Sequence, residues 1–330
     1  MTSLSLLAAT ALWAAPAAGA GATAAPDPVE FPLPWQDPSA IGRLFLQLPF
    51  QDPEVTPRGR VRVGARLQYS NHLLVESSPT MSAEIDFESL AATPSVRVGL
   101  GDGVELQAAL PFQADFGGVL DGVIDAVERG VHATPGPRRG RPPGMTRFRL
   151  RREDGTGVEY VEPTVGLGDA WGGVKVALAT GRPGPALSLR GALKLPTGRP
   201  GFGSGTVDLG VGAQLAWDGH PVTFHLEVDA VAPTGDLQGA GLPSRLYGAA
   251  QGGLSVRLGR DVALHLQMSA HLSPVYTDLD VLSKWTFYVV AGVSVRLGAA
   301  GLLRIGIAEN VVTPYRGADF AVLADGGLQL

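Results

Sequence analysis

The residues that could carry chemistry in this chain are histidines and carboxylates at every second position. His225, Glu227 and Asp229 have this spacing, and His265 and His271 share a second segment of the same kind. Imidazole and carboxylate groups are ordinary metal ligands. If both segments are strands, His225 and His265 lie two strands apart, roughly 10 Å at normal strand spacing, so ligands would have to reach across. We therefore predict neither a metal centre nor a cofactor.

A hydrolase would need a serine, a histidine and an acid on one face of neighbouring strands. Ser70-Asn71-His72 is the single suggestive cluster. We expect its serine and histidine to point to opposite faces of their strand, where they could not act as nucleophile and base. The prediction is that the protein is not an enzyme, with an outer-membrane hydrolase kept as the third alternative.

The elements that position these residues have a period of two, which is the spacing of side chains on one face of a strand. From 285 to 297, apolar residues such as Trp285, Phe287 and Val289 alternate with polar or small ones. The segments near 61–70, 222–229 and 262–272 repeat this pattern. Lengths of about 9 to 15 residues exceed those of soluble strands and match a tilted strand that crosses a bilayer.

These strands predict an all-β fold: a transmembrane antiparallel up-and-down β-barrel of about twelve strands, with a range of ten to fourteen. We expect strands to begin near 60, 81, 103, 170, 185, 205, 221, 244, 262, 284, 301 and 318, with 81 to 100 as one long bulged strand. Tight turns are expected at 101–103, 181–184, 218–220, 259–261 and 298–300. Longer connections are expected near 73–80, 114–169, 196–204, 233–243, 274–283 and 312–317.

The chain begins like an exported protein. Residues 1–25 carry no charged side chain, contain an apolar run and end in small residues, as a signal peptide does. Zero Cys excludes disulfides and thiolate metal sites, and the formal net charge of −5 provides no footprint for nucleic acid. No apolar stretch reaches the roughly 20 residues of a spanning helix. We predict the outer membrane of a Gram-negative bacterium, with membrane lipid and the barrel assembly machinery as partners.

Three further segments complete the domain organisation. Residues 26–59 are rich in proline and form a linker or a plug, and residues 60–330 form the barrel. The insertion at 114–169 contains one short helix, because Val119, Leu120, Val123, Ile124 and Val127 recur at helical spacing. Together with Asp169 and Trp171, these residues are candidates for the mouth or the plug of the barrel.

Strand parity also identifies the residues that face the lumen. Charges of both signs indicate internal ion pairs or a permeation path. The candidates are Arg62, Arg66, Glu84, Asp86, Glu88, Arg190, Lys194, His225, Glu227, Asp229, Arg257, His265, His271 and Arg296.

Several stretches resemble an uncharacterised Gram-negative outer-membrane β-barrel family, domain of unknown function 3187. They include Asn71-His72, the acidic run 84–88, and 117–125 followed by His132. Gly166-Leu167-Gly168-Asp169 and Lys194-Leu195-Pro196-Thr197-Gly198 are also similar to barrels grouped with the meta-pathway of phenol degradation. The resemblance implies a location rather than a mechanism.

The leading hypothesis is a passive channel or transporter for small molecules, with hydrophobic compounds favoured, because Trp171 and the insertion helix would place apolar surface at the mouth. The alternative is a closed structural or surface-interaction barrel without transport. The pattern leaves the cargo, the open or plugged state of the lumen and the oligomeric state undecided.

Overall fold

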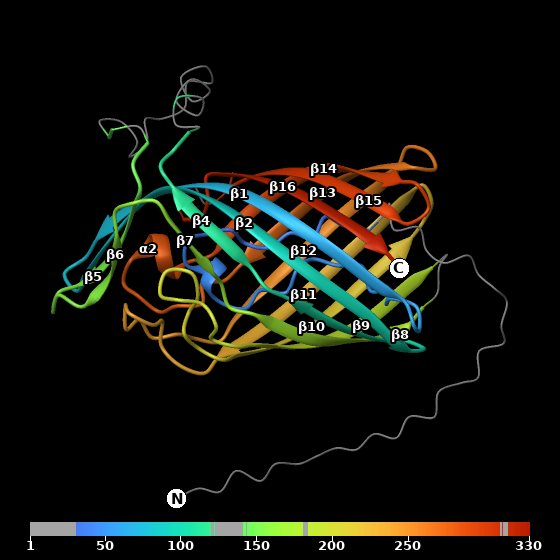
Figure 1. The fold of residues 1–330 in the computed structure, drawn as a ribbon, viewed down its shortest axis with the longest axis horizontal. Helices are drawn as coiled ribbons and strands as arrows, with labels where there is room; N and C mark the ends of the chain where they lie inside the picture. The colour runs from blue at the N-terminus through green and yellow to red at the C-terminus, as the bar shows by residue number, and fades with distance from the viewer. Residues whose placement is uncertain are drawn as a thin grey trace, which may run out of the picture.

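The computed structural model describes residues 31–119, 122, 141–142, 144–180, 184–310, 312 and 316–330. Within them, sixteen strands form a single antiparallel sheet that closes on itself, because β1 pairs with both β16 and β2 (Figure 1). The strands are β1 (Val61–Ser77), β2 (Met81–Gly101), β3 (Val104–Ala109), β4 (Phe112–Phe116), β5 (Arg147–Arg152), β6 (Gly157–Tyr160), β7 (Thr164–Leu167), β8 (Trp171–Ala179), β9 (Pro185–Lys194), β10 (Asp208–Asp218), β11 (Val222–Pro233), β12 (Tyr247–Arg257), β13 (Val262–His271), β14 (Thr286–Leu297), β15 (Gly301–Glu309) and β16 (Phe320–Gln329).

The described strands make twelve passes around the barrel. β3 and β4 follow one another along one pass and β7 and β8 along another, while β5 and β6 form a hairpin beside β2 and beyond the barrel wall. Each pass pairs with its sequence neighbours, so the topology is up and down. The twelve-stranded barrel predicted from the alternating pattern is confirmed.

The two ends of the barrel differ. Connections of a few residues join β2 to β3, β10 to β11, β12 to β13 and β14 to β15 at the end that also holds the C-terminus, which we call the turn end (Figure 1). Longer connections such as 195–207, 234–246 and 272–285 gather at the other end, the loop end. A short helix, α2 (Asp280–Ser283), lies in one of them, and the helix expected in the insertion falls outside the described residues except for its first positions.

Two expectations about connections are wrong. β1 runs to Ser77 and β2 begins at Met81, so the connection expected near 73–80 is a hairpin turn on a long two-stranded ribbon. The long connection expected at 114–169 also contains strands, because β5 pairs with the start of β2, β6 pairs with β5, and this hairpin extends the sheet past the barrel. The repeated Arg-Phe-Arg-Leu-Arg alternation at 147–151 is the strand signal that the proline-rich surroundings obscured.

The outer face of the barrel is apolar. Leu264, Leu266 and Met268 of β13 point outward and are about half exposed, while the intervening His265 and Gln267 are buried inside. Trp217 at the turn end and Trp285 at the loop end are also exposed, in keeping with interfacial aromatic anchors. Among the described residues, no helix is long and apolar enough to cross a membrane.

Residues 31–56 run inside the barrel, where Figure 1 shows them as the blue trace between the strands, and residues 57–60 are exposed where the chain leaves it. We call residues 31–57 of this segment the plug. It contains one 3-10 turn, η2 (Gly42–Leu44), and Leu33, Trp35 and Phe50 within it have almost no exposed surface. The chain leaves the lumen at the turn end, where Gly59 and Arg60 form backbone hydrogen bonds with Gly99 before β1 begins.

Apolar packing holds the plug at two levels. Near the loop end, Leu44, Phe45 and Leu46 belong to a cluster with Phe87, Phe148 and residues of the long connections. Lower in the barrel, Leu33 and Trp35 pack with Tyr288, Val290 and Leu323 of the wall, and the rings of Trp35 and Tyr288 are 5.3 Å apart. The first cluster lies among the connections of the loop end.

Candidate functional site in the barrel lumen

Polar groups of the wall bond to the backbone of the plug. Arg304 donates to the carbonyl of Pro32, Arg66 to that of Pro34 and Arg190 to that of Pro49, at 2.8, 3.0 and 2.7 Å. The plug follows no regular secondary structure over most of its length, so its own backbone groups need such partners when buried. The lumen side chains therefore serve as the plug's hydrogen-bonding scaffold.

Arg190 is the centre of the charged layer in the middle of the barrel. Its Nη2 lies 2.6 Å from Glu227 Oε1 and 2.9 Å from Asp229 Oδ2, and all three side chains are buried. Glu227 also accepts a hydrogen bond from Gln214 and one from the backbone N–H of Gln51 in the plug. Strands β9 and β11, which flank β10, thus supply opposite charges that meet against the plug.

A second ion pair lies on the neighbouring part of the wall. Lys175 Nζ lies 3.6 Å from Glu105 Oε1 and donates to the carbonyl of Asp52 at 3.1 Å. The other oxygen of Glu105 accepts hydrogen bonds from the backbone and hydroxyl of Thr56. Both carboxylate oxygens are consequently engaged, one by the wall and one by the plug.

At the loop end, the plug is anchored by Arg43. Its guanidinium forms two hydrogen bonds of 2.6 Å with the carboxylate of Asp115 on β4, and Tyr160 of β6 donates to the same carboxylate. Burial opposes the charge of Arg43, but the facing carboxylate of Asp115 outweighs it and raises the pKa of Arg43 above its ordinary value. This bidentate pair ties η2 to the barrel wall.

The histidines meet serines and carboxylates one at a time. His265 contacts the hydroxyls of Ser255 and Ser294 at 2.8 and 2.9 Å, His271 contacts Ser269, and His225 lies 3.5 Å from Asp52 of the plug. Among the described residues, no group of three or more histidines and carboxylates is placed to hold a metal ion. The rings act within the hydrogen-bonding network of the lumen.

The expectation that Ser70 and His72 point to opposite faces is wrong. The two residues are two positions apart, so a strand places them on the same face, and Ser70 Oγ lies 2.9 Å from His72 Nε2. Ser89 of β2 contacts both side chains. All three are buried, and no carboxylate of the described residues bonds to the His72 ring, so the cluster lacks the third member of a triad.

The placement of Glu84, Asp86 and Glu88 in the lumen is also wrong. β1 and β2 keep one register from Val61↔Val98 to Ser77↔Ser82, so β2 has no bulge between its lower half and its acidic run. The even-numbered acids therefore face away from the lumen side, which Ile85 and Phe87 occupy. Glu84 instead pairs with Arg147 and Arg149 of β5, and Asp86 pairs with Arg141.

The remaining predicted residues lie as follows. Arg62, Arg66, Arg257 and Arg296 occupy inward positions of β1, β12 and β14. Lys194 is buried between Asp169 and Asp208, at 2.5 and 3.3 Å. Asp169 also accepts backbone N–H groups of the 195–207 connection, so it organises that loop rather than lining an open mouth. Trp171 is partly buried inside the barrel, Val119 is exposed, and Leu120, Val123, Ile124 and Val127 fall outside the described residues.

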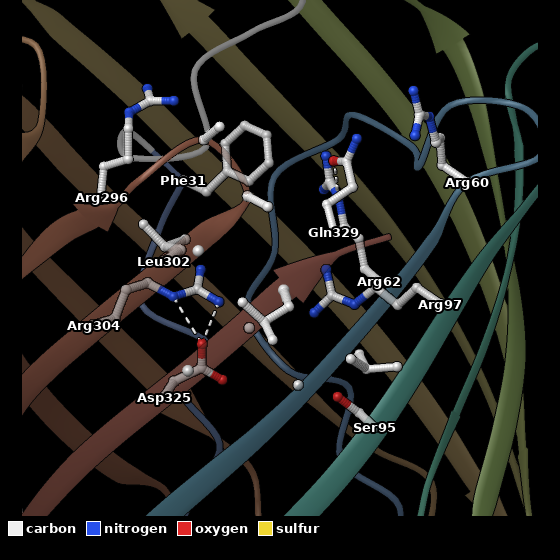
Figure 2. Close-up of a pocket in the computed structure, with 18 of the residues that line it drawn as sticks. Phe31, Arg60, Arg62, Ser95, Arg97, Arg296, Leu302, Arg304, Asp325 and Gln329 are labelled. Carbon is white, nitrogen blue, oxygen red and sulfur yellow. Dashed lines mark hydrogen bonds and ion pairs between the residues drawn. The ribbon is translucent and has the colours of Figure 1, made fainter.

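A cavity of about 610 Å³ opens at the turn end of the lumen (Figure 2). Its lining comes from the start of the plug, the starts of β1 and β15 and the ends of β2, β14 and β16. Figure 2 shows Arg62 and Arg97 beside one another, and Arg304 bonded to Asp325 across from them. Arg62 and Arg296, which strand parity assigned to the lumen from two distant segments, both line this cavity because closure of the barrel brings β1 and β14 to the same end.

Sequence reasoning did not identify the plug residues that contact the wall, chiefly Arg43, Gln51, Asp52 and Thr56. A usable signal was present, since an aromatic and proline-rich stretch at 31–35 is out of place in a hydrated linker. Its contacts could not be assigned because an irregular segment has no period that relates it to a strand.

Comparison with known proteins agrees with this architecture. Residues 31–325 match the family described as protein of unknown function DUF3187. The chain belongs to this family. No curated protein matches the sequence.

Solved structures provide the fold comparison. The COG4313 outer-membrane channel from Pseudomonas putida F1 superposes with a TM-score of 0.57 at 13% identity, covering 84% of this chain and 98% of the channel. The NanC porin matches with a TM-score of 0.42 at 11% identity, covering 81% of this chain and 97% of the porin. The toluene transporter TodX from P. putida matches at 0.36 and 10% identity, covering 83% and 90%. The likeness to the COG4313 channel shows that the DUF3187 chain has the fold of an outer-membrane barrel.

Proposed function

We propose that this DUF3187 protein is an outer-membrane passage for small molecules that the plug closes and that opens when the plug shifts. One observation carries the proposal: charged and polar side chains of the wall bond to the plug backbone at Pro32, Pro34, Pro49 and Thr56. A lumen with this lining could hydrate once the plug moves, as the polar interior of a porin does.

The character of the wall favours polar cargo over the hydrophobic cargo that Trp171 suggested. The middle of the barrel carries Arg190, Glu227, Asp229, Lys175 and Glu105, and Trp171 contributes only one partly buried ring to the interior. An apolar molecule passing through the axis would remove hydrogen-bonding partners from these groups without replacing them, which is costly. The likeness to a solved outer-membrane channel supports the transport class.

The orientation follows from the connection lengths. Outer-membrane barrels have short periplasmic turns and longer external loops, so the turn end faces the periplasm and the loop end faces outward. The apolar cluster around Phe45 and Phe148 would then close the outer side. Opening would require movement of both the plug and this cluster.

Planar-bilayer conductance tests the proposal. We would compare the intact refolded protein with a variant in which residues 31–57 are replaced by a short Gly-Ser linker. The alternative route to the same state is to fold the intact chain, cleave it with trypsin at the exposed Arg58 or Arg60, and extract the plug with urea. This second preparation covers the case in which the deletion does not fold.

The expected result is silence from the intact protein and discrete conductance steps after plug removal. Heat-shifted gel mobility serves as the control for folding of both preparations. Silence from correctly folded barrels that lack the plug would overturn the proposal and favour a closed structural barrel.

A further inference from the structure

The cavity at the turn end carries a large excess of positive charge. Asp325 is the one carboxylate among the described residues that line it. The lining arginines are Arg60, Arg62, Arg97, Arg260, Arg296 and Arg304. Guanidinium groups stay charged at any physiological pH, so their mutual repulsion persists unless an anion enters.

Two of these arginines already have carboxylate partners. Arg304 Nη2 lies 2.6 Å from Asp325 Oδ2, and Arg296 Nε lies 3.3 Å from Asp261 Oδ1 at the rim. Asp325 also lies opposite Arg66 in the register of β1 and β16. Among the described residues that line the cavity, Asp325 is therefore shared, and it forms its ion pair with Arg304 rather than with the arginines on the other side.

Arg62 and Arg97 have no carboxylate of the described residues within ion-pair distance, although Glu105 acts on both at longer range. They lie directly opposite one another in the register of β1 and β2, a position in which like charges are destabilising. Arg62 donates to the neutral amide oxygen of Gln329 at 3.1 Å, and no described carboxylate forms an ion pair with either arginine. Glu105, on the strand beside Arg97, already bonds to Lys175, Thr56 and Gln107.

Small inward residues explain the space between these charges. Gly64 lies between Arg62 and Arg66 on the inward face of β1, Gly327 lies between Asp325 and Gln329 on that of β16, and Ser95 faces Gly64 from β2. The resulting volume of about 610 Å³ falls within the range of small-molecule sites. Phe31 and Leu302 add apolar surface, and the Arg62 guanidinium lies 5.8 Å from the centre of the Phe31 ring.

We propose that this cavity binds a small organic anion, with carboxylate, phosphate or sulfonate groups on Arg62 and Arg97 and an apolar portion against Phe31 and Leu302. Carboxylate and phosphate groups suit guanidinium groups because two of their oxygens can accept two parallel hydrogen bonds. As a statement about the class of cargo, the inference rests on the proposed passage. As a statement about binding, it rests on the cavity alone.

Calorimetric titration of the full refolded chain in a nonionic detergent tests the binding. The probe is benzene-1,3,5-tricarboxylate, and the matched neutral compound is benzene-1,3,5-tricarboxamide. We expect saturable binding of the tricarboxylate, at least tenfold weaker binding of the tricarboxamide, and at least a tenfold loss of tricarboxylate affinity in Arg62→Gln and in Arg97→Gln. Equal binding of both compounds, or full affinity in both variants, would overturn the proposal.

Two glycine variants separate occupation of the cavity from a general effect on the barrel. A Cβ at inward Gly327 meets only ordinary contact, 3.4 Å from the Val63 carbonyl, so Gly327→Leu can fill the cavity without backbone conflict. Gly326 is its neighbour on the lipid face, where the nearest atom is 4.0 Å away, and Gly326→Leu is the matched control. We expect loss of binding in the first and none in the second, and the same affinity in both would contradict the assignment.

A lipid phosphate could offer the same chemistry as a soluble anion. Repeating the titration in nanodiscs of phosphatidylcholine and of phosphatidylglycerol distinguishes the two. Equal affinity supports a soluble ligand, and loss of tricarboxylate binding in phosphatidylglycerol would overturn it in favour of the lipid headgroup. Binding without conductance in any plug-free barrel would refute the proposed passage alone, whereas conductance without binding would refute this inference alone.

Discussion

The buried ion pairs around Arg190 lead to the sharpest prediction about stability. Arg190→Met keeps the approximate length of the side chain and removes its charge. The substitution leaves Glu227 and Asp229 facing each other in the lumen without the guanidinium that lies 2.6 and 2.9 Å from them. It also removes the donor to the Pro49 carbonyl of the plug.

The expected loss of unfolding free energy is about 3–5 kcal/mol, the usual cost of removing one partner from a buried pair. The lost bond to the plug carbonyl adds on the order of 1 kcal/mol. Proton uptake by one of the two carboxyl groups would reduce the repulsion, so we expect the total to stay near the lower end of the sum.

Urea unfolding in phosphatidylcholine vesicles, followed by tryptophan fluorescence, measures this change. The matched control is the triple variant Arg190→Met, Glu227→Gln and Asp229→Asn, which removes the uncompensated charges and should recover at least half of the lost stability. A single variant that loses less than about 1 kcal/mol would refute the reasoning, since the desolvation argument demands more. A triple variant as unstable as the single one would show that shape, rather than charge, sets the cost.

Two further predictions concern the ends of the barrel. A Cβ at Gly99 would lie 2.1 Å from the Pro57 carbonyl oxygen, so Gly99→Ala should displace the chain where it leaves the lumen and speed tryptic cleavage after Arg58 at least severalfold. Gly101→Ala is the control, because a Cβ there has nothing within 4 Å. Equal cleavage rates in the two variants would contradict the predicted displacement. At the loop end, hydrogen bonds from Ser78 and Thr80 lower the pKa of exposed Asp278 below its usual 3.8. A contact that lowers the pKa of a carboxyl group stabilises the folded state above the ordinary pKa of that group. This stabilisation is lost as the pH falls through the folded pKa. Hydrogen exchange of the amides at 78–80, corrected for intrinsic rates, should therefore be faster at pH 3 than at pH 6. Unchanged protection would count against the contact of Asp278 with Ser78 and Thr80. The same pH-dependent change in Asp278→Asn would also count against it.

The interior of the barrel shows where inference from pattern succeeded and where it failed. Strand parity correctly predicts an inward position for His225, Glu227 and Asp229, because one register runs unbroken along β11. The same method failed for Glu84, Asp86 and Glu88, because it assumed a bulge between the two halves of β2, where the register with β1 is unbroken. Parity is reliable only while the register is known, since a slip of one residue exchanges the two faces of a strand.

The sequence by itself determined the fold class and the apolar outer face, and it predicted about twelve passes around the barrel within a range of ten to fourteen. The reason is that backbone groups in lipid must all be paired, which forces long alternating strands to close into a barrel and leaves their period visible in the chain. Only the tertiary structure decided that residues 31–57 fill the lumen, that Arg43 and Asp115 join the plug to the wall, and that Arg62 and Arg97 share one cavity with a single acid. These contacts join an irregular segment to strands far away in sequence, or strands from opposite ends of the chain, and no local period records which side chains closure of the barrel brings together.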